Sequence, residues 1–228
     1  MKRFFSLVVA LMAMQLMFAA KIQVTNTSGD PTVEGSLPWA CKTGTSSDTI
    51  VFKFSTSGKK VINISTALSP TASIDGSTYS DSIIVDGSLD DGEHVSQGLS
   101  STGTFVKNIV VQNFVTGIRT SKNSNIINCV IRNNTADGVL SQMGESFQNC
   151  TIINNGDCGI DNQTGGSAGT ISSIENCEIS GNKLVGIRAG VAVMKKTSIL
   201  NNHIGLHALN AGDEISDCVI SGNDSIGV

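Results

Sequence analysis

Three side chains that could act on a sugar occupy equivalent positions in the second half of the chain. Asp161, Arg188 and His207 each lie two residues after a glycine, with one apolar residue between. An arginine binds a carboxylate through paired hydrogen bonds, and a histidine transfers protons near neutral pH. Stacked on an exposed face, they would form a substrate-binding strip for an acidic sugar. The alternative is an Asp161–Arg188 surface ion pair beside an inert histidine, worth about 0–1 kcal/mol.

Other sets of reactive side chains are not apparent in the sequence. Sugar hydrolysis needs carboxylates placed as acid and base, and Ca²⁺ binding needs several acidic ligands on one face. Asp157 and Asp161 come from one repeat, but no third carboxylate joins them in register. The cysteines lack Cys-x-x-Cys spacing and have no histidine in register. We therefore predict no catalytic residue, no metal site and no cofactor. Enzymatic activity stays open, and the sequence favours its absence.

Four cysteines occupy one column of a repeat, and they admit two interpretations. The residues are Cys129, Cys150, Cys177 and Cys218. Neighbours in a stack could form disulfides, since bonded cysteines have Cα atoms about 4.4–6.8 Å apart. A buried thiol also fills a core as a small apolar group. Because Thr197 occupies the same column without needing a partner, we favour buried thiols.

The repeat itself has a period of about 21 residues and four matching columns. Its first column is Asn113, Asn134, Asn155, Asn182, Asn202 and Asn223. The glycines that follow are Gly117, Gly138, Gly159, Gly186, Gly205 and Gly227, each with an apolar residue after it. Five residues before each asparagine stand Asn108, Cys129, Cys150, Cys177, Thr197 and Cys218. Two residues further on stand Val110, Ile131, Ile152, Ile179, Ile199 and Ile220.

This pattern predicts an all-β protein, a parallel β-helix. Alternation places the cysteine and isoleucine of each unit on the same inward face. The asparagine ends the strand and tolerates the left-handed backbone of a sharp corner. Stacked coils bury a continuous core, and stacked asparagines can form a hydrogen-bonded ladder. Helical repeats are longer, at roughly 33–34 residues, and leucine-rich repeats need a leucine framework that is missing here.

The unit resembles the right-handed parallel β-helix repeat of the pectin-lyase-like superfamily. The segments Val24–Asn26, Gly35–Ala40 and Asp48–Phe52 resemble an N-terminal module of bacterial exported members. That resemblance implies a cap over the first coil, with a short helix that we expect to begin at Pro38, since proline suits a first helical position. The predicted organisation is a signal peptide over 1–20, a cap and first strands over 21–60, and coils over 61–228.

Composition and the N-terminus indicate an exported protein. The 228 residues include 24 glycines, and only 15% are charged. Lys2 and Arg3 precede an apolar run and Ala19-Ala20, which is typical of a secretory signal. No later segment could span a membrane, and no basic stretch suggests nucleic acid binding. Because a solenoid needs a cap at each end, and none follows Val228, we expect these residues to be part of a longer protein.

Two functions fit these features. The first is a structural or adhesive scaffold, secreted or at the cell surface, that contacts polysaccharide or other surface components. The second is a polysaccharide lyase or glycoside hydrolase whose site includes Asp161, Arg188 and His207. The fold does not decide between them, because one scaffold can carry many functions.

Overall fold

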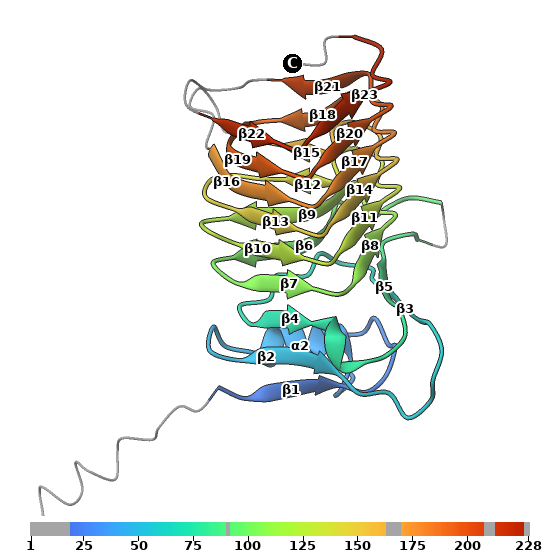
Figure 1. The fold of residues 1–228 in the computed structure, drawn as a ribbon. Helices are drawn as coiled ribbons and strands as arrows, with labels where there is room; N and C mark the ends of the chain where they lie inside the picture. The colour runs from blue at the N-terminus through green and yellow to red at the C-terminus, as the bar shows by residue number, and fades with distance from the viewer. Residues whose placement is uncertain (1–18, 90–91, 163–169, 208–212, 226–228) are drawn as a thin grey trace, which may run out of the picture.

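The computed structural model describes residues 19–228 except 90–91, 163–169, 208–212 and 226–228. All but the last two residues of the predicted signal peptide lie outside this range, as do Gly227 and Val228 of the repeat. The described residues wind into a stack of coils that rises from the N-terminal strands to the C-terminal ones (Figure 1). Among them, no helix is long and apolar enough to cross a membrane.

Three parallel sheets form the walls of the stack. Sheet A contains β1 (Lys21–Val24), β2 (Thr49–Phe52), β4 (Ser73–Asp75), β7 (Phe105–Lys107), β10 (Asn125–Ile127), β13 (Ser146–Gln148), β16 (Thr170–Glu175), β19 (Gly190–Lys195) and β22 (Glu214–Ser216). Sheet B contains β3 (Lys60–Asn63), β5 (Ile83–Asp86), β8 (Val110–Gln112), β11 (Val130–Arg132), β14 (Thr151–Ile153), β17 (Glu178–Ser180), β20 (Ser198–Leu200) and β23 (Val219–Ser221). Sheet C contains β6 (Gln97–Thr102), β9 (Thr116–Ser121), β12 (Val139–Leu140), β15 (Ile160–Asp161), β18 (Val185–Arg188) and β21 (Ile204–His207).

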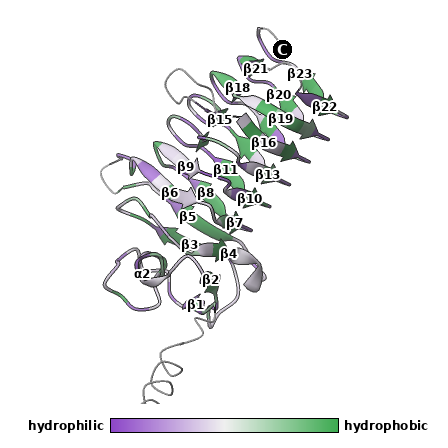
Figure 2. Ribbon diagram, turned by 90° about the vertical axis from the view of Figure 1, so that its left-hand side faces the viewer, coloured by the Kyte–Doolittle hydropathy of each residue, from purple (hydrophilic) through white to green (hydrophobic). Residues whose placement is uncertain are grey.

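In-register pairing builds the core. Ile131 pairs with Ile152, and Ile152 pairs with Ile179, so isoleucine recurs at three successive levels of sheet B. These isoleucines are fully buried, as is Cys150, which lies on the same face of its strand. Figure 2 shows hydrophobic residues on strands throughout the stack. The predicted parallel β-helix with coils of about 21 residues is confirmed.

A ladder of buried asparagines joins the coils at the corner between sheets B and C. The Nδ2 atoms of Asn134, Asn155 and Asn182 each donate to the Oδ1 atom of the next asparagine at 2.9 Å, and Asn202 continues to Asn223 at 3.2 Å. Each Oδ1 atom also accepts the backbone N–H of the preceding rung. A buried amide costs little when its groups are satisfied in this way.

The glycine column is explained by the same ladder. A Cβ atom added to Gly138 would lie 2.7 Å from both Asn155 Nδ2 and the carbonyl oxygen of Gly159. The next coil therefore approaches too closely for any side chain at this position.

In the first copy of the repeat, the glycine and apolar columns are aligned correctly, but the three columns before them are wrong by one residue. Val111, not Val110, pairs with Ile131, and the N–H of Phe114 donates to Asn134 Oδ1 where an asparagine was expected. Asn113 instead has a φ of 62°. It belongs to a second column, one residue before the ladder, that makes the left-handed corner through Asn133, Asn154 and Asn201. The ladder asparagine and the left-handed asparagine are thus different residues.

A second, exposed ladder follows the corner between sheets A and B. Asn128, Asn149 and Asn176 each donate to the asparagine one coil earlier, beginning at Asn108, at 2.7–3.1 Å. All four have left-handed backbone, with φ between 52° and 59°. Asn108 was predicted to lie in the cysteine column; the register places Ile109 there, opposite Cys129.

The N-terminal segment contributes the helix α2 (Leu37–Thr43). Ser36 caps it by accepting the N–H of Trp39 at 3.1 Å. The helix begins at Leu37, one residue before the predicted start at Pro38, because the capping hydroxyl sets its first turn. Leu37 and Ala40 are fully buried and join the hydrophobic core.

All six cysteines are free, and all but Cys218 are buried. Cys129, Cys150 and Cys177 each donate a weak hydrogen bond to a backbone carbonyl at 3.3 Å. Thr197 takes the same position and bonds the Lys195 carbonyl in the same way. At Cys129, Cys150 and Cys177 the column therefore holds thiols as small core groups, as predicted, whereas Cys218 is only partly buried.

The Asn155→Ala variant should lose about 1–3 kcal/mol of unfolding free energy, because it leaves groups of Asn134 and Asn182 buried and unsatisfied. Asn125→Ala changes an exposed asparagine in β10 and is the matched control, with little expected loss. Equal denaturation midpoints for the two variants would contradict the ladder.

The purified protein, unfolded in denaturant without reductant, should titrate with six thiols, since no cysteine has a bonded partner. Ellman's reagent measures the number directly, and a reduced sample is the control. Recovery of two thiols or fewer would mean that the stacked cysteines pair as disulfides.

Candidate functional site

The predicted strip lies on sheet C in the expected register. Asp161 pairs with Arg188, and Arg188 pairs with His207 in the next coil. His207 is exposed and Arg188 is partly exposed, but Asp161 is only 3% exposed, contrary to the outward position expected for it. Whether the strip binds a sugar stays a prediction.

Asp161 and Arg188 form a two-point ion pair. Arg188 donates from Nε to Asp161 Oδ1 at 2.8 Å and from Nη2 to Oδ2 at 2.7 Å. The hydrogen bonds to this carboxylate raise the pKa of Arg188 above its ordinary value. The arginine therefore keeps its proton and is a poor general base. The ion-pair alternative is correct in its partners, but the carboxylate is buried instead of lying on the surface.

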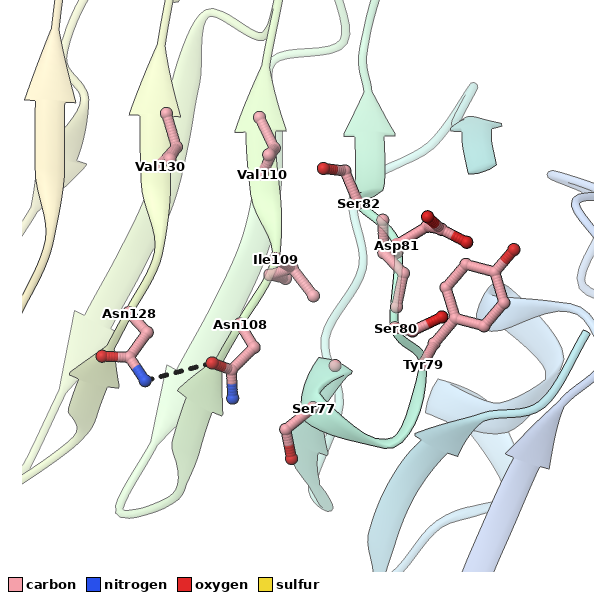
Figure 3. Close-up of a pocket in the computed structure, with 12 residues that line it drawn as sticks. Ser77, Tyr79, Ser80, Asp81, Ser82, Asn108, Ile109, Val110, Asn128 and Val130 are labelled. Atoms are coloured by element: carbon pink, nitrogen blue, oxygen red, sulfur yellow. Dashed lines mark hydrogen bonds between the residues drawn. The ribbon is translucent and has the colours of Figure 1, made fainter. Parts of the chain in front are cut away.

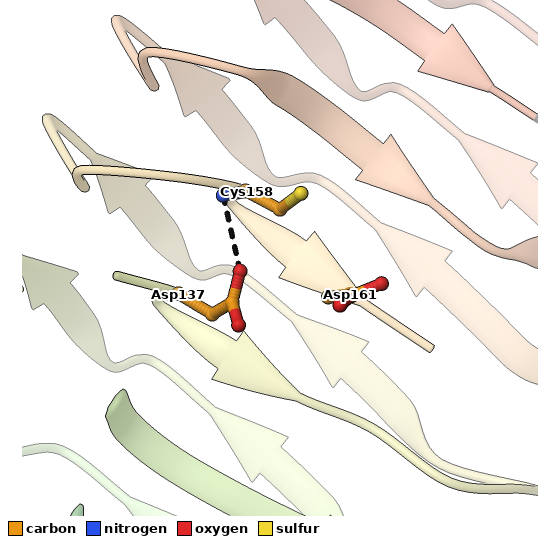
Figure 4. A group of neighbouring side chains, drawn as sticks. All are labelled: Asp137, Cys158 and Asp161. Atoms are coloured by element: carbon orange, nitrogen blue, oxygen red, sulfur yellow. Dashed lines mark hydrogen bonds between the residues drawn. The ribbon is translucent and has the colours of Figure 1, made fainter. Parts of the chain in front are cut away.

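A third charged group, which sequence reasoning missed, completes a cluster around this pair. Asp137 lies one coil before Cys158, and its Oδ1 atom accepts the backbone N–H of Cys158 at 3.1 Å (Figure 4). One ligand atom each from Asp137, Cys158 and Asp161 lies within 4.8 Å of the others. A signal was present, because Asp137 and Cys158 each stand directly before a repeat glycine, in one column.

Burial sets the ionisation of this cluster. Loss of solvent raises the pKa of Asp137 to about 6, and the charges of Asp161 and Asp157 contribute in the same direction. Loss of solvent also raises the pKa of the Cys158 thiol to about 12. The cluster thus holds one carboxylate tied to an arginine, one that titrates near neutral pH, and one protonated thiol.

A depression of about 350 Å³ lies beside the turn that follows the 3₁₀ helix η1 (Gly76–Thr78). Ser80, Asp81 and Ser82 line one side, and the exposed ladder amides of Asn108 and Asn128 line the other (Figure 3). Tyr79 points away from these amides. Its hydroxyl lies 2.7 and 2.8 Å from the carbonyl oxygens of Gly58 and Thr56.

A second depression, of about 230 Å³, lies on the outer face of sheet A. Its outward side chains come from three successive coils and occupy equivalent positions along their strands: Asn125, Ile127, Ser146, Gln148, Ser173 and Glu175. We call this set the sheet A groove. Amides, hydroxyls and one carboxylate, repeated about every 4.8 Å, offer a regular row of hydrogen-bonding groups.

Comparison with known proteins fits this architecture. The family model described as "Right handed beta helix region" matches residues 22–173. The chain belongs to this right-handed β-helix family. Among solved structures, the crystal structure of pectate lyase Pel9A is similar with a TM-score of 0.53 and 16% identity, covering 84% of this chain and 67% of the lyase. This likeness shows the fold. No curated protein matches.

Replacing Asp137 with asparagine should raise the free energy of unfolding, and the gain should be larger at neutral pH than at pH 4. The folded pKa of about 6 exceeds the ordinary value of 3.8, so the unfolded chain releases this proton at lower pH than the folded protein does. The contribution of Asp137 to stability therefore falls as pH rises from about 4 to about 6, and stays low above that range.

Urea denaturation at pH 4 and pH 7 tests this expectation. Relative to the wild-type protein, Asp137→Asn should gain stability at the higher pH. Asp157→Asn removes an exposed carboxylate near the same site and controls for lost net charge. A difference between wild type and Asp137→Asn that does not change with pH would contradict the effect of burial on this carboxyl.

Proposed function

We propose that this protein is an exported β-helix scaffold that binds polysaccharide without cleaving it. The observation that carries the proposal is the Asp161–Arg188 pair, whose charged groups are committed to each other at 2.7 and 2.8 Å. An arginine held in this way cannot accept a proton from a sugar ring, and a carboxylate 3% exposed cannot reach one. The strip predicted to bind substrate is therefore poorly suited to acid–base catalysis on a sugar.

The binding surface in this proposal is the sheet A groove. Asn125, Gln148 and Glu175 are exposed on three consecutive coils. Their amide and carboxylate groups suit the hydroxyls of a neutral polysaccharide. An acidic chain would require arginine or lysine, and neither is among the described residues that line the groove. The similarity in fold to a pectate lyase is consistent with contact to a polysaccharide.

Export and end-capping complete the proposal. Residues 1–20 would direct secretion, to the medium or the surface of a bacterial cell. Residues 21–60 would cap the first coil, and the burial of Leu37 and Ala40 in the core supports this role. A covered end protects strand edges that otherwise invite aggregation.

Glycoside hydrolysis is the second candidate, and one observation favours it. Asp137 and Asp161 have carboxylate oxygens within 4.8 Å, and burial raises the pKa of Asp137 to about 6. Sugar hydrolysis usually employs a pair of carboxyl groups, with separations of about 5–5.5 Å in retaining enzymes, and a carboxyl with a raised pKa suits the acid role. The burial of Asp161 is the argument against it.

Affinity electrophoresis in gels containing neutral polysaccharides or polygalacturonate tests the binding proposal. We expect retardation in a neutral gel. Gln148→Ala should reduce the affinity for the polysaccharide two- to tenfold, since one hydrogen bond contributes about 0.5–1.5 kcal/mol. Arg119→Ala, on the exposed face of sheet C, is the control and should bind normally. Equal retardation of the two variants would exclude the sheet A groove.

The same protein should release neither unsaturated products nor reducing ends from these polysaccharides. Reducing ends lost in Asp137→Asn would establish the hydrolase instead. Unsaturated products lost in Arg188→Ala would establish a lyase.

A further inference from the structure

The thiol of Cys158 differs from the other thiols of the stack. Cys129, Cys150 and Cys177 each donate to a backbone carbonyl of the core. Cys158 is fully buried directly before β15. In the part of the chain that the structure describes, its thiol donates to no backbone carbonyl, and the backbone of Val185 is its hydrogen-bonding neighbour. The thiol lies within 4.8 Å of carboxylate oxygens of Asp137 and Asp161. A buried sulfur and two carboxylates that converge within this distance are the kinds of ligand atoms that bind a transition-metal ion.

We propose that Asp137, Cys158 and Asp161 bind a divalent transition-metal ion of the zinc class. A thiolate ligand selects zinc and related ions, whereas Ca²⁺ and Mg²⁺ take oxygen ligands alone. Three protein ligands, with a solvent molecule in the fourth position, form a common zinc arrangement. Asp137 is only partly buried, so the ion and its solvent ligand can enter from that side. This proposal is independent of polysaccharide binding.

The distances allow such a site with small movements. Zinc bonds of about 2.0–2.3 Å separate tetrahedral ligand atoms by roughly 3.5 Å. Ligand atoms within 4.8 Å therefore need to approach by about 1 Å, which side-chain rotation supplies. The backbone of the site is held in place by sheet pairing on both sides of β15.

Arg188 is compatible with the ion. Each carboxylate offers about four lone-pair positions, and Arg188 uses one on each oxygen of Asp161. The remaining lone pairs can bind the metal, while Arg188 holds the carboxylate in orientation as outer partners of metal ligands do. Charges also balance. One thiolate and two carboxylates carry −3, and a divalent ion with Arg188 carries +3. On binding, the thiol proton passes to solvent.

Co²⁺ titration of the full-length protein tests the proposal, because a cobalt thiolate has a charge-transfer absorption band that carboxylate coordination lacks. The wild-type protein should bind one equivalent and develop the band, and Zn²⁺ should abolish it. Cys158→Ser should lose the band. Cys129→Ser should keep it, and it should fold, since Thr197 shows that the column accepts a hydroxyl.

The melting temperature of the wild-type protein with and without metal tests the proposal even if a variant fails to fold. Zn²⁺ should raise the melting temperature of the wild-type protein, and Asp137→Asn should weaken Zn²⁺ binding at least tenfold in calorimetry. Ca²⁺ should do neither. Absence of Co²⁺ binding by the wild-type protein, a band that survives in Cys158→Ser, or stabilisation by Ca²⁺ equal to that by Zn²⁺ would each overturn the proposal.

Discussion

In-register stacking of parallel coils decides which side chains of this molecule meet. A strand pairs with its equivalents about 4.8 Å above and below, so the neighbours of a residue lie one coil away, usually 20 or 21 positions along the chain. The buried asparagine ladder enforces this register. A slip of one residue would break the bonds of every rung and would turn isoleucines such as Ile152 away from the core.

The ladder also explains how the coils tolerate different lengths. Between Asn155 and Asn182 the coil has 27 residues, yet the ladder bond stays at 2.9 Å. The additional residues lie in the connection between β15 and β16, which leads from sheet C to sheet A. Sheet C therefore keeps its register through this coil, and Asp161 meets Arg188 although 27 residues separate them.

The sequence predicted the fold, the core columns and the stacking of Asp161, Arg188 and His207. Residues one repeat apart occupy equivalent positions on successive coils of a solenoid, so they stack on one another. The prediction was wrong where a residue of the expected type does not occupy the expected position in the coil. Asn113 matched the ladder by type, but Phe114 occupies its place. Asp137 was overlooked because the residue type in its column differs from coil to coil, from Thr116 to Asp137 to Cys158, so the column shows no repeated residue. The burial of Asp161 depends on packing between coils, which a one-dimensional pattern does not report.

The variation of residue type in the column of Asp137 and Cys158 bears on the role of these two residues. The fold accepts Val185 and Ile204 in the column of Asp137 and Cys158, so an apolar residue would fit there. Replacing buried charges by apolar groups is often neutral or stabilising, whereas a buried ion pair is weak evidence for stability. The ladder and the isoleucine columns already hold the coils together without these charges. Two carboxylates, an arginine and a thiol on three consecutive coils are therefore better explained by what they bind than by what they stabilise.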